Sequence, residues 1–165
     1  MKLNMNSFIE TGAWCIAISL LIFACFINWR KATVSFIFIQ LLTWPLGIFA
    51  VEYGALMYPV RFFSKLMSTS FTYEFIALPA IGTIYCMYFP QEQRMLVKAL
   101  YIVAFPTALT LAEVILLKYT DLIRYIHWSW YLSWLTIGIT LHLNYLFFRW
   151  FFKKENAHNS GGIHN

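Results

Sequence analysis

Five long apolar stretches limit what this chain can fold into. A helix needs about 20 mostly apolar residues to cross the hydrocarbon core of a bilayer, which is about 30 Å thick. Each stretch is close to that length, and polar or proline-containing segments separate them. The pattern predicts five membrane-spanning segments, at about residues 8–29, 34–58, 71–89, 96–117 and 125–148.

The stretches are continuously apolar, whereas the strands of a membrane barrel alternate between apolar and polar residues. The predicted fold class is therefore all-α, an integral membrane bundle of five transmembrane helices. Pro45, Pro79 and Pro106 fall inside the stretches. We expect kinks there, because neighbouring helices satisfy the carbonyl groups that proline frees. Residues 1–152 should form a single transmembrane domain, and the polar tail 153–165 should be disordered.

Composition argues against a water-soluble enzyme. The 165 residues are 61% hydrophobic and 12% charged, and an average soluble domain carries about 25% charged residues. A soluble fold of this length cannot hide so much apolar surface. The expected partner is the lipid bilayer, and the sequence indicates no particular partner protein.

The formal net charge of +5 does not indicate a nucleic-acid partner, because the basic residues are spread singly or in pairs between the apolar stretches and form no basic stripe. The cysteines at positions 15, 25 and 86 lack the paired spacing of a metal site or redox motif. His127 and His142 both lie in the fifth stretch, so they cannot hold a haem between two helices. We expect no metal and no cofactor.

Five crossings assign every loop to one of two faces. Face one holds the amino terminus and the loops at 58–70 and 118–124; face two holds Arg30 and Lys31, the loop at 90–95 and the tail. Five Lys and Arg residues lie on face one and seven on face two. The positive-inside rule then predicts an amino terminus outside and a carboxyl terminus in the cytoplasm.

Acidic residues gather toward face one. Because alternate helices run in opposite directions, Glu52, Glu74 and Glu113 should share one level, roughly 9 to 10 Å from the midpoint of their spans. A charge at the centre of a membrane helix costs at least about 2.5 to 3.5 kcal/mol on insertion scales. We therefore predict a polar cluster of residues that lie toward face one, namely Glu52, Glu74, Glu113, Arg61, Arg124 and His127.

Two interpretations of this cluster remain open. In the first, the acids pair with Arg61, Arg124, His127 or the neighbouring lysines and clamp the helices together. In the second, they line a polar cavity, open to face one, that binds a cation, a proton or a small polar solute.

Three sequence segments carry a resemblance to a known family. The segments are WPLGIFAVEYGALMYPVRFF from Trp44, STSFTYEFIALP, and EVILLKYTDLIRYIHWSW. Together they cover most of residues 40–135, and their most specific parts lie on or beside face one. The chain resembles a family of small, uncharacterised multi-pass membrane proteins of spore-forming Bacillota. The resemblance implies a bacterial host and a membrane location, and it implies no reaction or site.

The leading functional hypothesis is a non-enzymatic multi-pass membrane protein whose cluster near face one is either a structural clamp or an ion- or solute-binding site. A small transporter or substrate-capture subunit is one alternative, and a membrane-embedded enzyme that modifies lipids is another. Against the enzyme, the sequence has no aspartate-rich metal pair, no nucleophile with an evident base and no phosphate-binding loop. No catalytic residue is predicted.

Overall fold

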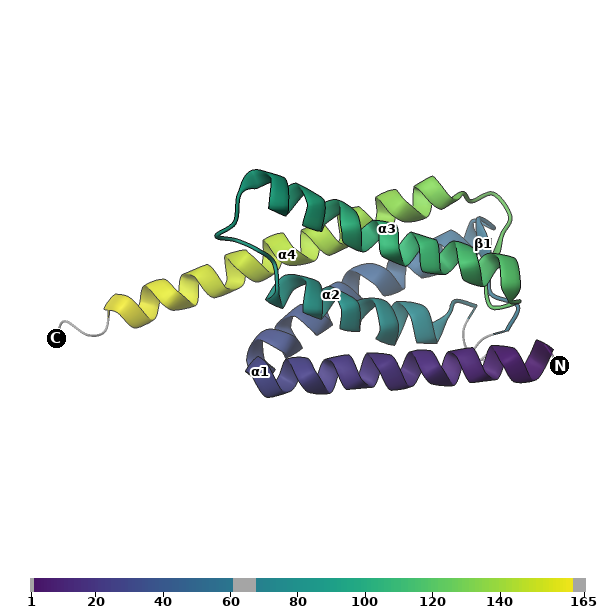
Figure 1. The fold of residues 1–165 in the computed structure, drawn as a ribbon, viewed down its shortest axis with the longest axis horizontal. Helices are drawn as coiled ribbons and strands as arrows, with labels where there is room; N and C mark the ends of the chain where they lie inside the picture. The colour runs from purple at the N-terminus through teal and green to yellow at the C-terminus, as the bar shows by residue number, and fades with distance from the viewer. Residues whose placement is uncertain (1, 61–67, 162–165) are drawn as a thin grey trace.

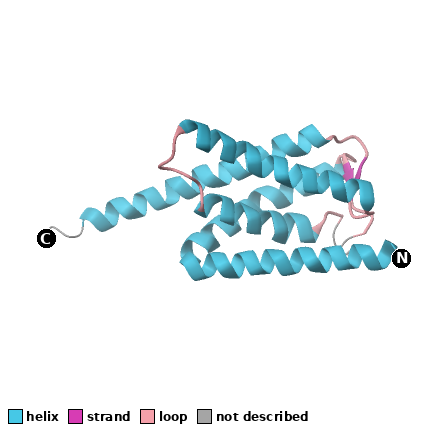
Figure 2. Ribbon diagram, viewed as in Figure 1, coloured by secondary structure: helices cyan, strands magenta, loops and turns pink. Residues whose placement is uncertain are grey.

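The computed structural model describes residues 2–60 and 68–161, and these are mostly helical. The order of elements is α1 (Lys2–Glu52), β1 (Leu56–Met57), the π-helix η1 (Phe71–Ala77), α2 (Leu78–Met87), α3 (Met95–Tyr119), β2 (Arg124–Tyr125) and α4 (Trp130–Gly161). Figure 2 shows helices throughout, with a short strand pair at one end. The prediction of an all-α chain is confirmed at this level.

Helix α1 bends at Asn28 and folds back on itself (Figure 1). Asn28 has an extended backbone, with φ −160° and ψ 95°. Its side-chain oxygen accepts a hydrogen bond from the backbone N–H of Lys31 at 3.0 Å, which is the bond that an N-cap residue makes. Asn28 therefore separates a first segment of α1 (residues 2–27) from a second segment (residues 29–52).

With that bend, successive helical segments of the described chain run in opposite directions (Figure 1). These segments are the two parts of α1, η1 with α2, α3, and α4. The amino terminus, β1 and the connection into α4 lie at one end of the bundle, which is the face-one end. The bend of α1, the α2–α3 loop and the outgoing half of α4 lie at the other, face-two end. Lys31 of the bend sits over the ring of Phe152 in α4, at 5.8 Å, and this contact places the two elements together at face two.

A small strand pair ties the loops together at the face-one end. β1 and β2 are antiparallel, with Leu56 opposite Tyr125 and Met57 opposite Arg124. The second segment of α1 ends at Glu52 and not near Tyr58 as predicted, because Gly54 adopts a positive φ of 65°. This conformation is typical of the residue that stops a helix. Similarly, α4 begins at Trp130 because residues 124–125 pair as β2.

Helix α4 also extends further than predicted. Its backbone stays helical to Gly161, whereas the sequence predicts a disordered tail from residue 153. The extension leaves the bundle at the face-two end (Figure 1).

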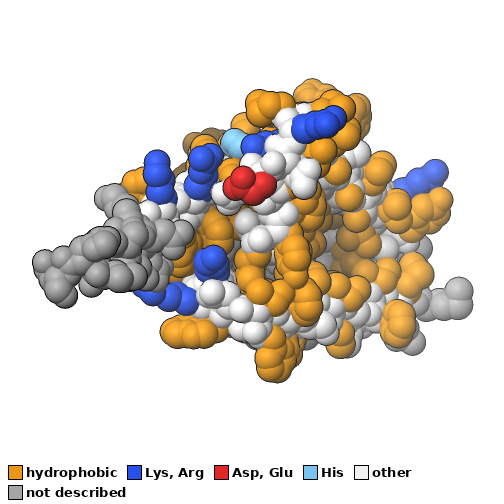
Figure 3. All heavy atoms as spheres, turned by 60° about the vertical axis from the view of Figure 1, so that its left-hand side comes forward, with side chains coloured by type: hydrophobic (Ala, Val, Ile, Leu, Met, Phe, Trp, Pro, Cys, Tyr) orange, Lys and Arg blue, Asp and Glu red, His pale blue; other side chains and the backbone are white. Residues whose placement is uncertain are grey.

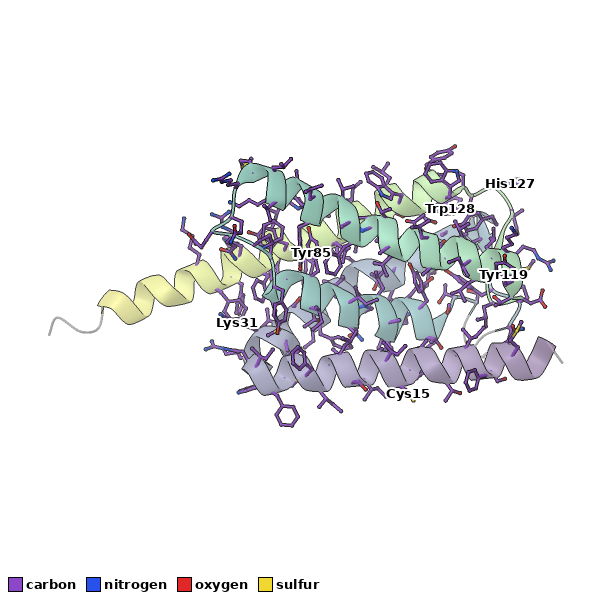
Figure 4. The ribbon with its side chains drawn as sticks, viewed as in Figure 1. Cys15, Lys31, Tyr85, Tyr119, His127 and Trp128 are labelled. Atoms are coloured by element: carbon purple, nitrogen blue, oxygen red, sulfur yellow. The ribbon has the colours of Figure 1, made fainter. Side chains whose placement is uncertain are left out.

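The core lies between the second segment of α1, α2, α3 and α4. Tyr85, labelled in Figure 4, is almost fully buried there and packs against two aromatic rings of α3, tilted against Tyr101 and edge-on to Phe105. Asn144 of α4 is fully buried and donates hydrogen bonds to Ser35 Oγ at 3.0 Å and to the carbonyl oxygen of Gly82 at 3.4 Å. One amide thus joins three helices.

The outer surface is apolar. Large hydrophobic side chains are exposed along the helices, and Phe26 reaches 87% exposure. Figure 3 shows them covering much of the visible face, with Lys and Arg side chains gathered around the end from which α4 leaves. Among the described residues, two helices are long and apolar enough to cross a membrane, Met5–Glu52 and Met95–Tyr119, and Phe71–Met87 is a shorter apolar helix. This supports association with a membrane; the five-span bundle stays a prediction.

Candidate functional site

Two adjoining cavities lie inside the bundle toward the face-one end. The larger has a volume of about 100 Å³ and lies between the second segment of α1, η1, α3 and α4. The smaller, of about 80 Å³, lies between the first segment of α1, η1 and α3, and includes Glu10 in its lining. Both are lined by Tyr58, Tyr73 and Glu113, so the two cavities meet at these three side chains.

Glu74 reaches the larger cavity from the π-helix η1. Ser70 begins this element by accepting a hydrogen bond from the backbone N–H of Tyr73 at 3.3 Å. π-helical turns are rare and occur frequently at functional sites. Here the turn brings two consecutive residues, Tyr73 and Glu74, into the lining of one cavity.

The second segment of α1 supports this irregular turn. Pro79 has no backbone N–H, so the carbonyl group of Phe75 lacks its usual helical donor. Gln40 donates its side-chain N–H to the oxygen of Phe75 at 2.8 Å, and Thr43 donates its hydroxyl to the backbone oxygen of Glu74 at 2.8 Å. Two polar side chains one turn apart therefore fix the backbone from which Glu74 projects.

The Glu74 carboxyl group is only half satisfied. The residue is 5% exposed. Its Oε1 accepts a hydrogen bond from the hydroxyl of Tyr58 at 3.2 Å, and the hydroxyl of Thr69 also faces the carboxyl group. Its Oε2 is buried without a hydrogen-bond partner. The carboxyl group packs directly against Gly47 on α1, where a Cβ atom would overlap it. Since Gly47 also lines the larger cavity, the unpartnered oxygen lies at the cavity wall.

Glu113 of α3 is equally buried but better satisfied. It is 5% exposed, and its Oε1 accepts hydrogen bonds from the hydroxyls of Tyr125 at 2.7 Å and Ser133 at 2.8 Å. The indole N–H of Trp128 donates to the Ser133 oxygen at 2.8 Å. Figure 4 shows Trp128 in the connection just before α4. Glu113 thus joins α3 to this connection and to the start of α4.

Three tyrosines surround the two carboxyl groups. Tyr58 bonds Glu74 and Tyr125 bonds Glu113. The hydroxyl of Tyr73 faces Glu113, and its oxygen accepts no hydrogen bond. Desolvation by burial raises the pKa of the phenols of Tyr58 and Tyr125, both outside the helices. Each phenol therefore stays protonated and donates a hydrogen bond to a carboxyl oxygen.

The other predicted site residues lie elsewhere. Glu52 is exposed at the end of α1, with the Ser68 hydroxyl 3.5 Å from its Oε1. Arg124 and His127 are exposed at the face-one end, where Figure 4 labels His127, and Arg61 lies outside the described residues. Lys118 is exposed too. The structure brings Glu74 and Glu113 together and leaves Glu52, Arg124 and His127 out of the cavities.

The neutral partners of the two glutamates were not predicted as site residues. These partners are Tyr58, Tyr73, Tyr125 and Ser133, and Gly47, against which Glu74 packs, was not predicted either. One available signal is the spacing of Gln40, Thr43 and Gly47, which places two polar residues and a glycine on the same face of an otherwise apolar helix. That face contacts η1 and Glu74.

The cavities are acidic and contain no basic side chain from the described part of the chain. Neither lining includes a Lys, Arg or His residue among residues 2–60 and 68–161. Within those same ranges, no group of three or more His, Cys, Asp or Glu residues could hold a metal ion. The arrangement is therefore suited to attract a positive charge.

Comparisons with known proteins found no family model, no curated protein and no solved structure that matches the chain.

Proposed function

We propose that the chain is a bacterial inner-membrane protein whose helical segments cross the bilayer five times, with the amino terminus outside. Three observations support this proposal. Five apolar segments run antiparallel (Figure 1), large hydrophobic side chains are exposed, and Lys and Arg side chains gather at the face-two end (Figure 3). The resemblance of residues 40–135 supports membership in the Bacillota family of small multi-pass membrane proteins.

We propose that the cavity between Glu74 and Glu113 binds a small cationic solute or ion. The observation that carries this proposal is the Oε2 atom of Glu74, which is buried at the cavity wall with no hydrogen-bond partner. Burying a polar group without a partner costs roughly 1–3 kcal/mol by mutational data, and more for a charge. A cation in the cavity supplies the missing partner.

The clamp interpretation fits one glutamate better than the other. Glu113 is hydrogen-bonded to Tyr125 and Ser133 and so joins α3 to the start of α4. Glu74 is bonded by Tyr58 and faces Thr69, yet it keeps an unpartnered oxygen, and a buried oxygen without a partner adds nothing to stability. We therefore assign the ligand chiefly to Glu74 and a mixed structural and electrostatic role to Glu113.

A transport role is the second candidate, and the adjoining cavities favour it. The smaller cavity includes Glu10, and both cavities include Glu113. A cation that moves from one cavity to the other meets an acidic side chain in each. Uptake into proteoliposomes tests this candidate separately from binding.

The binding proposal is tested by thermal unfolding of the purified chain in detergent, against a panel of inorganic and organic cations at fixed ionic strength. We expect at least one cation to raise the Tm of the wild type. Glu74→Gln should remove that rise, because the substitution replaces the negative charge with a neutral amide of similar shape.

Glu92→Gln is the matched control. Glu92 is exposed in the loop between α2 and α3, so this variant should respond to cations as the wild type does. If no cation changes the Tm of the wild type, or if Glu74→Gln responds as fully as Glu92→Gln, the cavity is not a cation site.

A further inference from the structure

We infer that the ligand of the Glu74 cavity is a protonated organic amine with a short apolar stem. This inference rests on the proposed function, and it names the chemical class of the cation. Three features of the cavity distinguish an amine from an inorganic ion: the position of the free acceptors, the chemistry of the remaining wall, and the volume.

The free acceptors lie side by side in the sequence. Glu74 Oε2 is buried without a hydrogen-bond partner. The buried hydroxyl of Tyr73 faces Glu113, and its oxygen accepts no hydrogen bond. Both residues line the larger cavity from η1. An ammonium group carries three N–H donors and no acceptor. One such group can donate to the carboxylate and to the phenol oxygen together, and so satisfy both atoms.

The rest of the wall suits a carbon stem. Aromatic and aliphatic side chains form much of the lining, which includes Tyr58, Trp128, Leu46, Leu56, Leu78 and Ile137. Aromatic faces attract ammonium groups, and the aliphatic residues exclude water from the stem. Hydroxyls of Thr43, Ser133, Thr136 and Thr140 supply further polar contacts.

A divalent metal fits this wall poorly. Calcium takes six to eight oxygen ligands, and magnesium demands a near-octahedral set. The described lining contributes two carboxyl groups, of which Glu113 already accepts two hydrogen bonds at Oε1. Across residues 2–60 and 68–161 there is no cluster of three or more metal-ligating side chains.

The volume is larger than a bare ion requires. A buried water needs about 10–15 Å³ of such space, so the cavity of about 100 Å³ is several times larger than a single water or a bare ion requires. An amine with a few carbon atoms fills that space and displaces water from the apolar side chains of the lining. A single inorganic ion leaves most of it to water.

The test uses propylammonium chloride as the probe and the full chain in detergent. Thermal unfolding and saturation-transfer NMR are measured with propylammonium, with n-propanol as its neutral counterpart, and with sodium, potassium, magnesium and calcium chlorides at matched ionic strength. We expect propylammonium to raise the Tm and to show saturation transfer to its methylene protons. Neither n-propanol nor the inorganic salts should raise the Tm.

Variants locate the contact. We expect Glu74→Gln to weaken propylammonium binding at least roughly tenfold and Tyr73→Phe to weaken it severalfold, with Glu92→Gln unchanged. If Glu74→Gln does not fold, the comparison of propylammonium with n-propanol on the wild type still decides the question. If propylammonium and n-propanol change the Tm equally, the assignment of the ligand as a protonated amine is overturned.

The outcomes separate the two proposals. If sodium, potassium or a divalent salt raises the Tm in a Glu74-dependent manner and propylammonium does not, the amine assignment is overturned and the cation site stands. If no cation of either kind raises the Tm, both proposals fail.

Discussion

At the residue scale, the position of the Glu74 carboxyl group depends on a glycine in another helix. Gly47 allows the carboxyl group to pack against the backbone of α1, and a Cβ atom at position 47 would overlap it. We expect Gly47→Ala to displace the carboxyl group and to lower the free energy of unfolding by about 1–3 kcal/mol, the usual cost of overpacking. The cation-dependent rise in Tm should disappear with it.

Gly12→Ala is the matched control for this substitution. A Cβ atom at Gly12 meets no atom within 4 Å, and alanine favours the helix by roughly 0.5–1 kcal/mol over glycine. Gly12→Ala should therefore be neutral or stabilising and should keep the cation response. A Gly47→Ala variant that binds cations as the wild type does would contradict the packing of Glu74 described above.

Ser133 is the second residue on which the site depends. Its oxygen donates to Glu113 and accepts from Trp128, so Ser133→Ala leaves a buried carboxyl group and an indole N–H each short of one partner. We expect a loss of about 1–3 kcal/mol in the free energy of unfolding. Equilibrium unfolding in mixed detergent micelles measures it.

The control for Ser133 is Ser19→Ala. Ser19 is exposed, and its hydroxyl bonds only the carbonyl oxygen of Cys15 in its own helix, at 2.7 Å. This variant should change stability little. Equal losses for the two serines would show that the Glu113 network contributes nothing to holding α3 against α4.

At the element scale, Asn28 decides whether α1 is one helix or two. Its extended backbone interrupts the helix, and its side chain caps the second segment through Lys31. We expect Asn28→Ala to lower the free energy of unfolding by about 0.5–2 kcal/mol, since alanine offers no oxygen to the exposed N–H group. Asn28→Ser should retain most of the stability, because serine caps helices about as well. If alanine and serine behave alike at this position, the cap is not what stabilises the bend.

The apolar runs predict the helices along the chain well in the middle of the sequence. The predicted stretches 71–89 and 96–117 correspond to Phe71–Met87 and Met95–Tyr119. Length and apolarity alone decide these bounds, because the flanking segments are polar or contain proline. The bounds fail where a local backbone feature acts, as at Gly54 and at the β1–β2 pair.

The composition of the site was harder to predict. Hydropathy and the number of predicted crossings give the level of a residue along the bundle. They place Glu74 and Glu113 toward the same end. They do not give the rotation of each helix, which packing decides. Glu52 was predicted at that level as well but is exposed, whereas Gly47, which lies five residues earlier, faces Glu74. Only the contact between η1 and α1 reveals this difference.

At the scale of the whole molecule, the antiparallel order of the segments predicts which loops share a side of the membrane. The α2–α3 loop with Glu92 lies at the face-two end, and His127 lies at the face-one end (Figures 1 and 4). Both side chains are exposed. Five crossings therefore place position 92 in the cytoplasm and position 127 outside, if the positive-inside rule decides the orientation.

Single added cysteines measure this arrangement in intact spheroplasts with a membrane-impermeant maleimide. We expect His127→Cys to be labelled at once and Glu92→Cys only after lysis. The wild type should stay unlabelled throughout, because Cys86 is buried and Cys15 and Cys25 lie on the apolar outer surface of the first segment of α1, which lipid covers in this arrangement. Labelling of position 92 alone before lysis reverses the orientation but keeps α3 as a crossing, because α3 is the helix between the two positions. Labelling of both positions from one side shows that α3 does not cross, and it removes the argument that lipid surrounds all five segments.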